Sequence, residues 1–180
     1  MLINYSDYNR SEELFTLKNN SVNIWEELYF CLKNMPLYLK QSDQKGKQGE
    51  AIFDPVGTNE HIKRKLESTE GWQPNFPIPD RYRHLGTDID FIKKGILVEV
   101  QFSNYPFLTN NLLRSELFFK SNYLPFEEKV EGLIIVTKAG DYPSSNSTLY
   151  YEQAKKLIDS LCAENVFSIP IRLVCLDIEY

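Results

Sequence analysis

Segment 23–35 carries hydrophobic side chains at the spacing of a helix. They lie three or four residues apart along the chain: Ile24, Leu28, Cys31, Leu32 and Met35. Pro36 follows directly, and proline commonly stands just beyond a helix end. The pattern predicts an amphipathic helix with its apolar side in the core. Residues 11–14 (SEEL) predict the first turn of another helix, so the first third of the chain is expected to be helical where it is regular.

Two continuous hydrophobic runs in the second half of the chain predict strands. They span residues 132–137 and 168–176, and short apolar runs of this kind are typical of strands. Segment 147–161, between them, carries apolar side chains along one side of a helix: Leu149, Ala154, Leu157, Ile158 and Leu161. Strands interleaved with helices predict an α/β or α+β core.

Three less regular segments complete the pattern. Residues 71–80 hold three prolines, each of which excludes the residue before it from a helix, so we expect an ordered extended loop. Residues 53–57 (FDPVG) are typical of a turn. Residues 61–66 include the basic run Lys63, Arg64 and Lys65. We interpret this run as a solvated helix end, with a phosphate contact as the alternative.

The segment 85–102 alternates between apolar and polar positions. From residue 96 onward it predicts a strand with one apolar face and one mixed face: Ile96, Val98, Val100 and Phe102 against Leu97, Glu99 and Gln101. Residues 88–92 alternate in the same way, and Gly95 can take the positive φ of a tight turn. A two-residue loop at Lys94 and Gly95 pairs residue 93 with residue 96. Asp90 then lies opposite Glu99, and Asp88 opposite Gln101, whereas a three-residue loop would break this register.

Asp90 and Glu99 would then be close enough to bind one cation. Directly opposed residues in a sheet have Cβ atoms about 4.5–5.5 Å apart. Two such carboxylates repel each other and raise each other's pKa, and a Mg²⁺ ion between them offsets the repulsion. The spacing leaves an alternative open: Asp88 and Asp90 line a solvent-facing edge, and Glu99 pairs with a nearby lysine.

Composition limits the class of protein further. The chain has 180 residues, 42% hydrophobic and 25% charged, so we expect one domain over residues 1–180. No run reaches the roughly 18 apolar residues of a membrane span, and the N-terminus has no signal-peptide pattern. Cys31, Cys162 and Cys175 lack the spacing of a disulfide framework or a zinc site, which favours reduced thiols in the cytoplasm. The net charge of −5 disfavours nucleic acid as a partner, although a local basic groove is compatible with it.

Asp90, the hairpin, and Glu99 followed by Gln101 form a pattern that resembles the PD-(D/E)xK nuclease core. Six longer blocks resemble the BglII-type family of type II restriction endonucleases, in the same order and with near-equal spacing: FDPVGTN (53–59), LGTDIDF (85–91), LVEVQFSNYPFL (97–108), RSELF (114–118), STLYYEQA (147–154) and NVFSIPIRLV (165–174). The likeness covers essentially the whole chain. It implies an α/β fold with a mixed β-sheet core of restriction-endonuclease type, flanked by helices, and a small β-rich subdomain. It also implies a homodimer acting on a two-fold-symmetric site in double-stranded DNA.

The resemblance implies a set of catalytic residues. Asp90 and Glu99 are expected to bind Mg²⁺, with the carbonyl of Val100 as a third protein ligand. Gln101 stands where most of the superfamily has lysine. Its amide cannot be deprotonated, so it could only orient the attacking water, and the metal would lower the pKa of that water. Asn75 is expected to help order the site, although by itself it would be typical of a turn.

The resemblance also implies residues that read DNA. Ser103 and Asn104, after the catalytic strand, and Asn146 and Ser147, before the helix at 149–161, are expected in the major groove. Asparagine can make two hydrogen bonds to adenine, and serine can serve either base. Arg114 suits a guanine or a phosphate. Without the resemblance, Asn146 and Ser147 would be an ordinary helix cap and Arg114 a solvated helix residue.

Together these features predict a type II site-specific deoxyribonuclease that uses Mg²⁺ to cut a palindrome with a GATC core (AGATCT-like). The helix after Pro106 resembles the family's dimerisation element, with an intramolecular core helix as the alternative. A DNA-binding remnant with weak or no cleavage and a related nuclease of relaxed specificity are the other functions considered. The family continues beyond the position of Tyr180, in a segment with contacts toward the outer part of the recognition site. We therefore expect greater tolerance at the outermost base pair.

Overall fold

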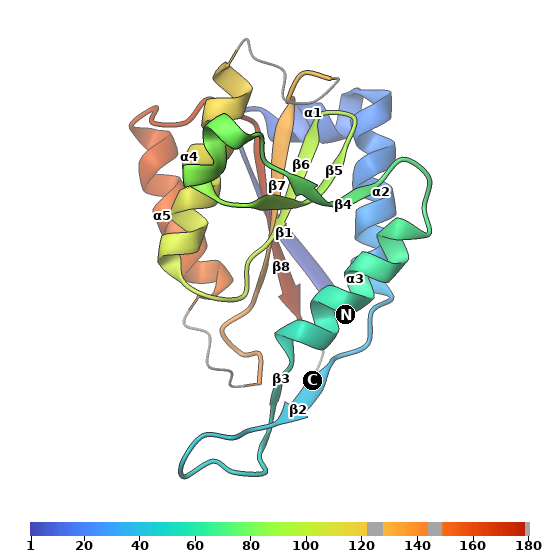
Figure 1. Cartoon of the computed structure of the whole chain (residues 1–180), viewed down its shortest axis with the longest axis vertical. Coiled ribbons are helices and arrows are strands. Elements are labelled where there is room, and N and C mark those ends of the chain that lie inside the picture. The colour runs from blue at the N-terminus through green and yellow to red at the C-terminus, as the bar shows by residue number, and fades with distance from the viewer. Residues whose placement is uncertain (122–127, 144–148, 179–180) are drawn as a thin grey trace.

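A six-stranded mixed sheet forms the centre of the molecule (Figure 1). The computed structural model describes residues 1–121, 128–143 and 149–178. The strands lie in the spatial order β1 (Leu2–Tyr8), β8 (Ile171–Asp177), β7 (Gly132–Lys138), β6 (Ile96–Val100), β5 (Asp88–Lys93) and β4 (Gln73–Pro77). Strands β6, β7 and β8 run parallel to one another, and the remaining neighbours are antiparallel.

Helices cover both faces of this sheet. One face carries α1 (Ser11–Leu17), α2 (Asn19–Lys33) and α3 (Pro55–Glu67), and the other carries α4 (Tyr105–Lys120) and α5 (Tyr151–Ala163) (Figure 1). A separate two-stranded sheet, β2 (Leu39–Gln41) with β3 (Ala51–Phe53), projects at one end, and the short 3₁₀ helix η1 (Asp80–Leu85) precedes β5. The predicted α/β fold, a mixed sheet flanked by helices, is confirmed. Within the described part of the chain, no helix is long and apolar enough to cross a bilayer.

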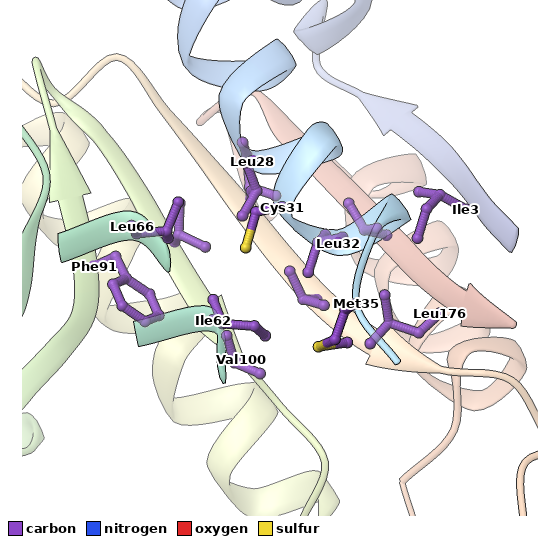
Figure 2. Close-up of a cluster of buried hydrophobic side chains, with 14 of the residues drawn as sticks. Ile3, Leu28, Cys31, Leu32, Met35, Ile62, Leu66, Phe91, Val100 and Leu176 are labelled. Atoms are coloured by element: carbon purple, nitrogen blue, oxygen red, sulfur yellow. The ribbon is translucent and has the colours of Figure 1, made fainter. Parts of the chain in front are cut away.

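Helix α2 confirms the predicted amphipathic helix and begins four residues earlier than predicted. All five side chains of its predicted apolar stripe are buried. Leu28, Cys31 and Leu32 point toward the sheet, and Met35 follows them into the same cluster (Figure 2). This burial, rather than the helix propensity of the sequence, holds the helix on the sheet.

The predicted alternation along β6 is also confirmed. Its apolar side, Ile96, Val98 and Val100, continues to Phe102, and these residues pack in the cluster beneath α2 and α3. Leu97 belongs to the second cluster, beneath α4 and α5. Because side chains alternate along a strand, Glu99 shares the face of Leu97 and points toward α4.

The β5–β6 turn has the predicted two-residue loop. Lys94 and Gly95 both have positive φ, 44° and 77°, as a type I′ turn requires. A side chain at position 95 would collide with its surroundings, because its Cβ would lie 2.2 Å from the carbonyl oxygen of Lys129. Glycine is therefore required here both by the backbone conformation and by the space available.

Three predictions about local structure were wrong. The expectation that the first third of the chain is helical where it is regular was wrong for strand β1, an edge strand with a weak hydrophobic pattern. Asn4 is exposed, whereas Asp7 pairs with the buried Arg172. The proline-rich segment is not a loop but contains strand β4. It lies at the other edge of the sheet, where the missing N–H groups of Pro74 and Pro77 leave the ladder intact.

The expected turn at 53–57 contains the beginning of a helix. Helix α3 begins at Pro55, and the Asp54 side chain accepts a hydrogen bond from the Val56 N–H at 3.1 Å. An aspartate cap followed by proline at the first helical position is a strong start signal, and it outweighed the turn pattern. Strand β8 and helix α5 begin later than predicted, at Ile171 and Tyr151.

Candidate active site

Asp90 and Glu99 are brought together by the β5–β6 hairpin in the predicted register. The ladder pairs Lys93 with Ile96, continues to the pair of Phe91 and Val98, and ends there. Beyond it, Oδ2 of Asp90 accepts a hydrogen bond from the Val100 N–H at 2.7 Å. The aspartate side chain thus replaces the next backbone bond and lies beside Glu99 and Val100.

The expected pairing of Asp88 with Gln101 is not formed. Asp88 is exposed and pairs with Pro77 of β4 instead, because the β5–β6 ladder ends before reaching it. The alternative of a solvent-facing edge is therefore correct for Asp88 only. Its second half, a lysine partner for Glu99, is wrong, since Lys93 pairs with Glu27 at 2.6 Å.

Glu99 forms a buried ion pair with Arg114 of α4. The side chains are 3% and 4% exposed. Nη2 of Arg114 donates to Oε1 of Glu99, and Nδ2 of Asn111 donates to Oε2 at 3.2 Å. Nη1 of Arg114 also donates to the carbonyl of Leu85 at 3.2 Å. The guanidinium thus ties β6 to the segment that leads into β5.

Burial raises the pKa of both carboxyl groups. The pKa of Glu99 rises to about 8, chiefly through loss of hydration and partly through the charge of Asp90, while Arg114 opposes the rise. The pKa of Asp90 is raised by burial and by Asp88, and the Val100 N–H opposes this. Two neighbouring carboxyl groups with raised pKa values form a site that gains stability from a bound cation.

The donors at this site fit a hard divalent cation. Two carboxylates and the Val100 carbonyl are oxygen ligands of the kind that Mg²⁺ takes, with water completing the shell. Over residues 1–121, 128–143 and 149–178 there is no cluster of three or more His, Cys, Asp or Glu side chains placed to hold a metal. A cation here would therefore depend on Asp90, Glu99, a backbone oxygen and water.

A pocket of about 220 Å³ opens beside Asp90. Its walls come from three elements: Asn59, Glu60 and Lys63 of α3, Asn75 of β4, and Asp90, Phe91 and Val100 of the hairpin. Three predicted site residues, Asn75, Asp90 and Val100, thus line one cavity. Glu99 does not line it, because its carboxylate is buried against Arg114.

Asn75 lies opposite Asp90 across the β4–β5 pair. Pro74 pairs with Phe91 and Phe76 with Ile89, so the register places Asn75 between them, facing Asp90. Its φ of 47° removes it from the regular ladder. Asparagine tolerates this left-handed conformation better than most residues. The sequence alone did not predict that the backbone of Asn75 leaves the regular strand conformation at this point.

The predicted DNA-reading residues fall in different environments. Ser103 is exposed, and its Oγ donates to Oε1 of Gln101 at 3.2 Å. Asn104 caps α4, its Oδ1 accepting from the Phe107 N–H at 3.5 Å. Asn146 and Ser147 lie outside the described residues.

Arg114 is not a solvated helix residue, so that alternative is wrong. It is 4% exposed and held by Glu99 and Leu85. Its Nε is buried without a hydrogen-bond partner among the residues that the structure describes. A contact of Arg114 with DNA stays a prediction, and in this conformation its guanidinium faces Glu99 of β6.

Asn111 and the pocket-lining side of α3 were not predicted from the sequence. Asn111 stands three residues before Arg114, so both share a helix face. Polar residues on the same buried stripe as Leu108 and Leu112 were the available signal. For α3, the basic run separates into Lys63, which lines the pocket, and Arg64 and Lys65, which are exposed.

Comparison with known proteins gives one consistent result. The model of the restriction endonuclease BglII/BglIII family matches residues 3–176. The type II restriction enzyme BglII of Bacillus subtilis is 52% identical over 174 residues, which cover 97% of this chain and 75% of that enzyme.

Two solved structures resemble the chain closely. The crystal structure of BglII complexed with a DNA 16-mer superposes with a TM-score of 0.92 at 51% identity, covering 100% of this chain and 78% of that one. Free BglII superposes with a TM-score of 0.75 at 48% identity, covering 100% and 81%. The conformation described here is thus closer to that DNA-bound structure than to the free one.

Proposed function

The chain belongs to the restriction endonuclease BglII/BglIII family, and from this premise we propose that it is a type II restriction endonuclease that hydrolyses phosphodiester bonds in double-stranded DNA. Its target is a palindrome with a GATC core, AGATCT-like. The cofactor is Mg²⁺, and the working unit is a homodimer. We also place the protein in the cytoplasm, consistent with its three free cysteines.

The observation that carries this proposal is the pair of carboxyl groups at the end of the β5–β6 hairpin. Asp90 and Glu99 come from adjacent strands, burial raises the pKa of both, and a pocket opens on Asp90. Such a pair binds a cation and, through it, an anionic substrate.

Each residue of the site has a defined task in the reaction. Asp90, Glu99 and the carbonyl of Val100 would hold Mg²⁺, which supplies activation of water and neutralisation of phosphate charge when bound. Gln101 orients the attacking water, since its amide can donate and accept hydrogen bonds but cannot take up the proton of that water. Asn75 helps to order the site beside Asp90. Arg114 and Asn111 fix the Glu99 carboxylate in place.

Hydrolysis proceeds by in-line displacement at phosphorus. The water oxygen forms the new bond to phosphorus, and its proton passes to solvent. The bond from phosphorus to the 3′ oxygen breaks, and that oxygen takes a proton from water. The products are a 5′ phosphate and a 3′ hydroxyl, so neither Asp90 nor Glu99 needs to act as a general acid.

DNA recognition and dimer assembly complete the proposal. Ser103, Asn104, Asn146 and Ser147 are proposed to read base edges. A DNA contact of Arg114 would require its guanidinium to leave Glu99. The α4 helix is proposed as the dimerisation element, since Leu113 and Leu117 lie one turn apart and are both exposed.

A plasmid digest with Mg²⁺, followed by sequencing of the ends, tests the function. Cleavage confined to AGATCT sites is the expected result. Cleavage at many unrelated sequences would instead indicate a nuclease of relaxed specificity. Sequence-specific binding without cleavage, measured by gel shift in Ca²⁺, would indicate a DNA-binding remnant.

A further inference from the structure

One wall of the active-site pocket comes from helix α3, which the proposed mechanism does not use. Asn59, Glu60 and Lys63 line the pocket together with Asp90 and Val100. These three positions are one, three or four residues apart, so they share one side of the helix.

The placement of α3 is fixed by its packing. Ile62 and Leu66 are fully buried and point into the cluster that contains Phe91 and Val100 (Figure 2). The Asp54 cap anchors the first turn. The apolar side of α3 is held against β5 and β6. The adjacent side of the helix, which carries Lys63, therefore lines the pocket.

The charges around the pocket are unbalanced. Asp90 and Glu60 are acidic, Asn59, Asn75 and Val100 are neutral, and Lys63 is the cation in the lining. No ion pair among the described residues joins Lys63 to Glu60 or Asp90, although salt bridges elsewhere in the molecule are well formed. Lys63 is thus the basic side chain in the lining of a cavity large enough for a phosphate group, and it forms no salt bridge with either carboxylate of that lining.

We propose that Lys63 binds a non-bridging oxygen of the phosphate that is cut. This inference rests on the proposed function and names a further catalytic residue for it. Negative charge builds up on the phosphoryl oxygens as water attacks, and Gln101, next to Val100, carries no charge to oppose it. A cation placed in advance at this position stabilises the transition state more than it stabilises the ground state.

The test compares single-turnover cleavage with DNA binding. A duplex with one AGATCT site is cut in Mg²⁺ with enzyme in excess, and binding to the same duplex is measured in Ca²⁺. For Lys63→Gln we expect the cleavage rate to fall roughly 10²-fold or more, the usual loss when one charge-stabilising group is removed. The affinity should change only a few-fold, because one phosphate contact is a small part of the interface. Lys63→Arg should recover much of the rate.

Helix α3 provides matched controls. Arg64 and Lys65 are exposed neighbours that do not line the pocket, so Arg64→Gln and Lys65→Gln remove the same charge and should cleave at nearly the wild-type rate. Thermal unfolding establishes that each variant is folded. If Lys63→Gln is not folded, Lys63→Met replaces it in the test, because methionine keeps the apolar part of the lysine side chain.

Two results would overturn the inference while leaving the proposed function in place. One is wild-type cleavage by the Lys63 variants, or a loss no greater than that of the two controls. The other is a loss confined to affinity, which would place Lys63 on a phosphate elsewhere along the backbone. Absence of cleavage by the wild-type protein in Mg²⁺ would instead reject the proposed function and the inference with it.

Discussion

At the scale of single residues, the ion pair of Arg114 with Glu99 dominates the energetics of the site. Both side chains are almost fully buried, and the carboxylate has a raised pKa even beside the guanidinium. Removing one partner leaves the other charge buried without compensation, which is more costly than removing both.

We therefore predict that Glu99→Leu and Arg114→Met each lower the free energy of unfolding by about 3–5 kcal/mol. The double variant Glu99→Leu/Arg114→Met should lose much less than the sum of the two. Urea denaturation measures these values. This differs from the simple expectation for a metal ligand, whose replacement affects activity and leaves the fold unchanged.

The exposed pair of Arg10 with Glu13 is a suitable control. Its separation should have no measurable effect on stability, because both groups remain hydrated when the partner is removed. If the double variant lost as much free energy of unfolding as the two single variants added together, the role assigned to the Arg114 guanidinium would be contradicted.

The same residues show how far the sequence predicts the site. The proximity of Asp90 and Glu99 follows from a nine-residue separation and a local turn, so it could be read from the pattern. The partner of Glu99 could not, because Arg114 comes from α4, beyond the end of β6, and the direction of its side chain depends on how α4 packs on the sheet. Asn75 could be placed only once β4 was known to pair with β5.

At the scale of elements, the β5–β6 turn sets the register that brings the carboxylates together. Gly95→Ala should lower the free energy of unfolding by about 2–5 kcal/mol, the sum of a left-handed backbone penalty and a clash with the Lys129 carbonyl. Chemical denaturation measures this loss.

Gly46 provides the matched control for the turn. Its φ of 87° is also positive, but no atom lies within 4 Å of the Cβ position. Gly46→Ala should therefore cost only the backbone penalty, about 1–2 kcal/mol. Equal losses at the two glycines would mean that the contact with Lys129 does not constrain the hairpin.

Elements with strong local signals were predicted, and those defined by their neighbours were not. Helix α2 and the hairpin strands carry complete hydrophobic patterns, so periodicity identifies them. Strands β1 and β4 lie at the two edges of the sheet, where polar residues and prolines are tolerated because one side of the strand has no partner. Their strand character comes from pairing with β8 and β5, which a local pattern does not report.

At the scale of the whole molecule, the proposed function requires two active sites related by a two-fold axis. A palindrome presents the same bases to each half, so one site must act on each strand. Leu113 and Leu117 are 52% and 39% exposed on one side of α4, and in the proposed dimer the partner subunit would cover them.

We predict that the protein sediments as a dimer on an AGATCT duplex and that Leu113→Glu/Leu117→Lys weakens the dimer by at least 10-fold, about 1.4 kcal/mol. Leu17, 76% exposed on α1, is the control, and Leu17→Glu should leave assembly unchanged. Analytical ultracentrifugation distinguishes these outcomes. A strictly monomeric complex on a single palindrome would be incompatible with the proposed assembly.

The most direct test of the proposed nuclease uses Asp90. Asp90→Asn keeps a side-chain oxygen for the Val100 N–H but removes the charge that would bind Mg²⁺, so folding should be preserved. In single-turnover assays on an AGATCT duplex, the wild-type protein should cut in Mg²⁺ and bind without cutting in Ca²⁺. Asp90→Asn should bind in Ca²⁺ but lose cleavage by roughly 10³-fold or more. Cleavage by Asp90→Asn at the wild-type rate would contradict the assignment of this pocket as the active site.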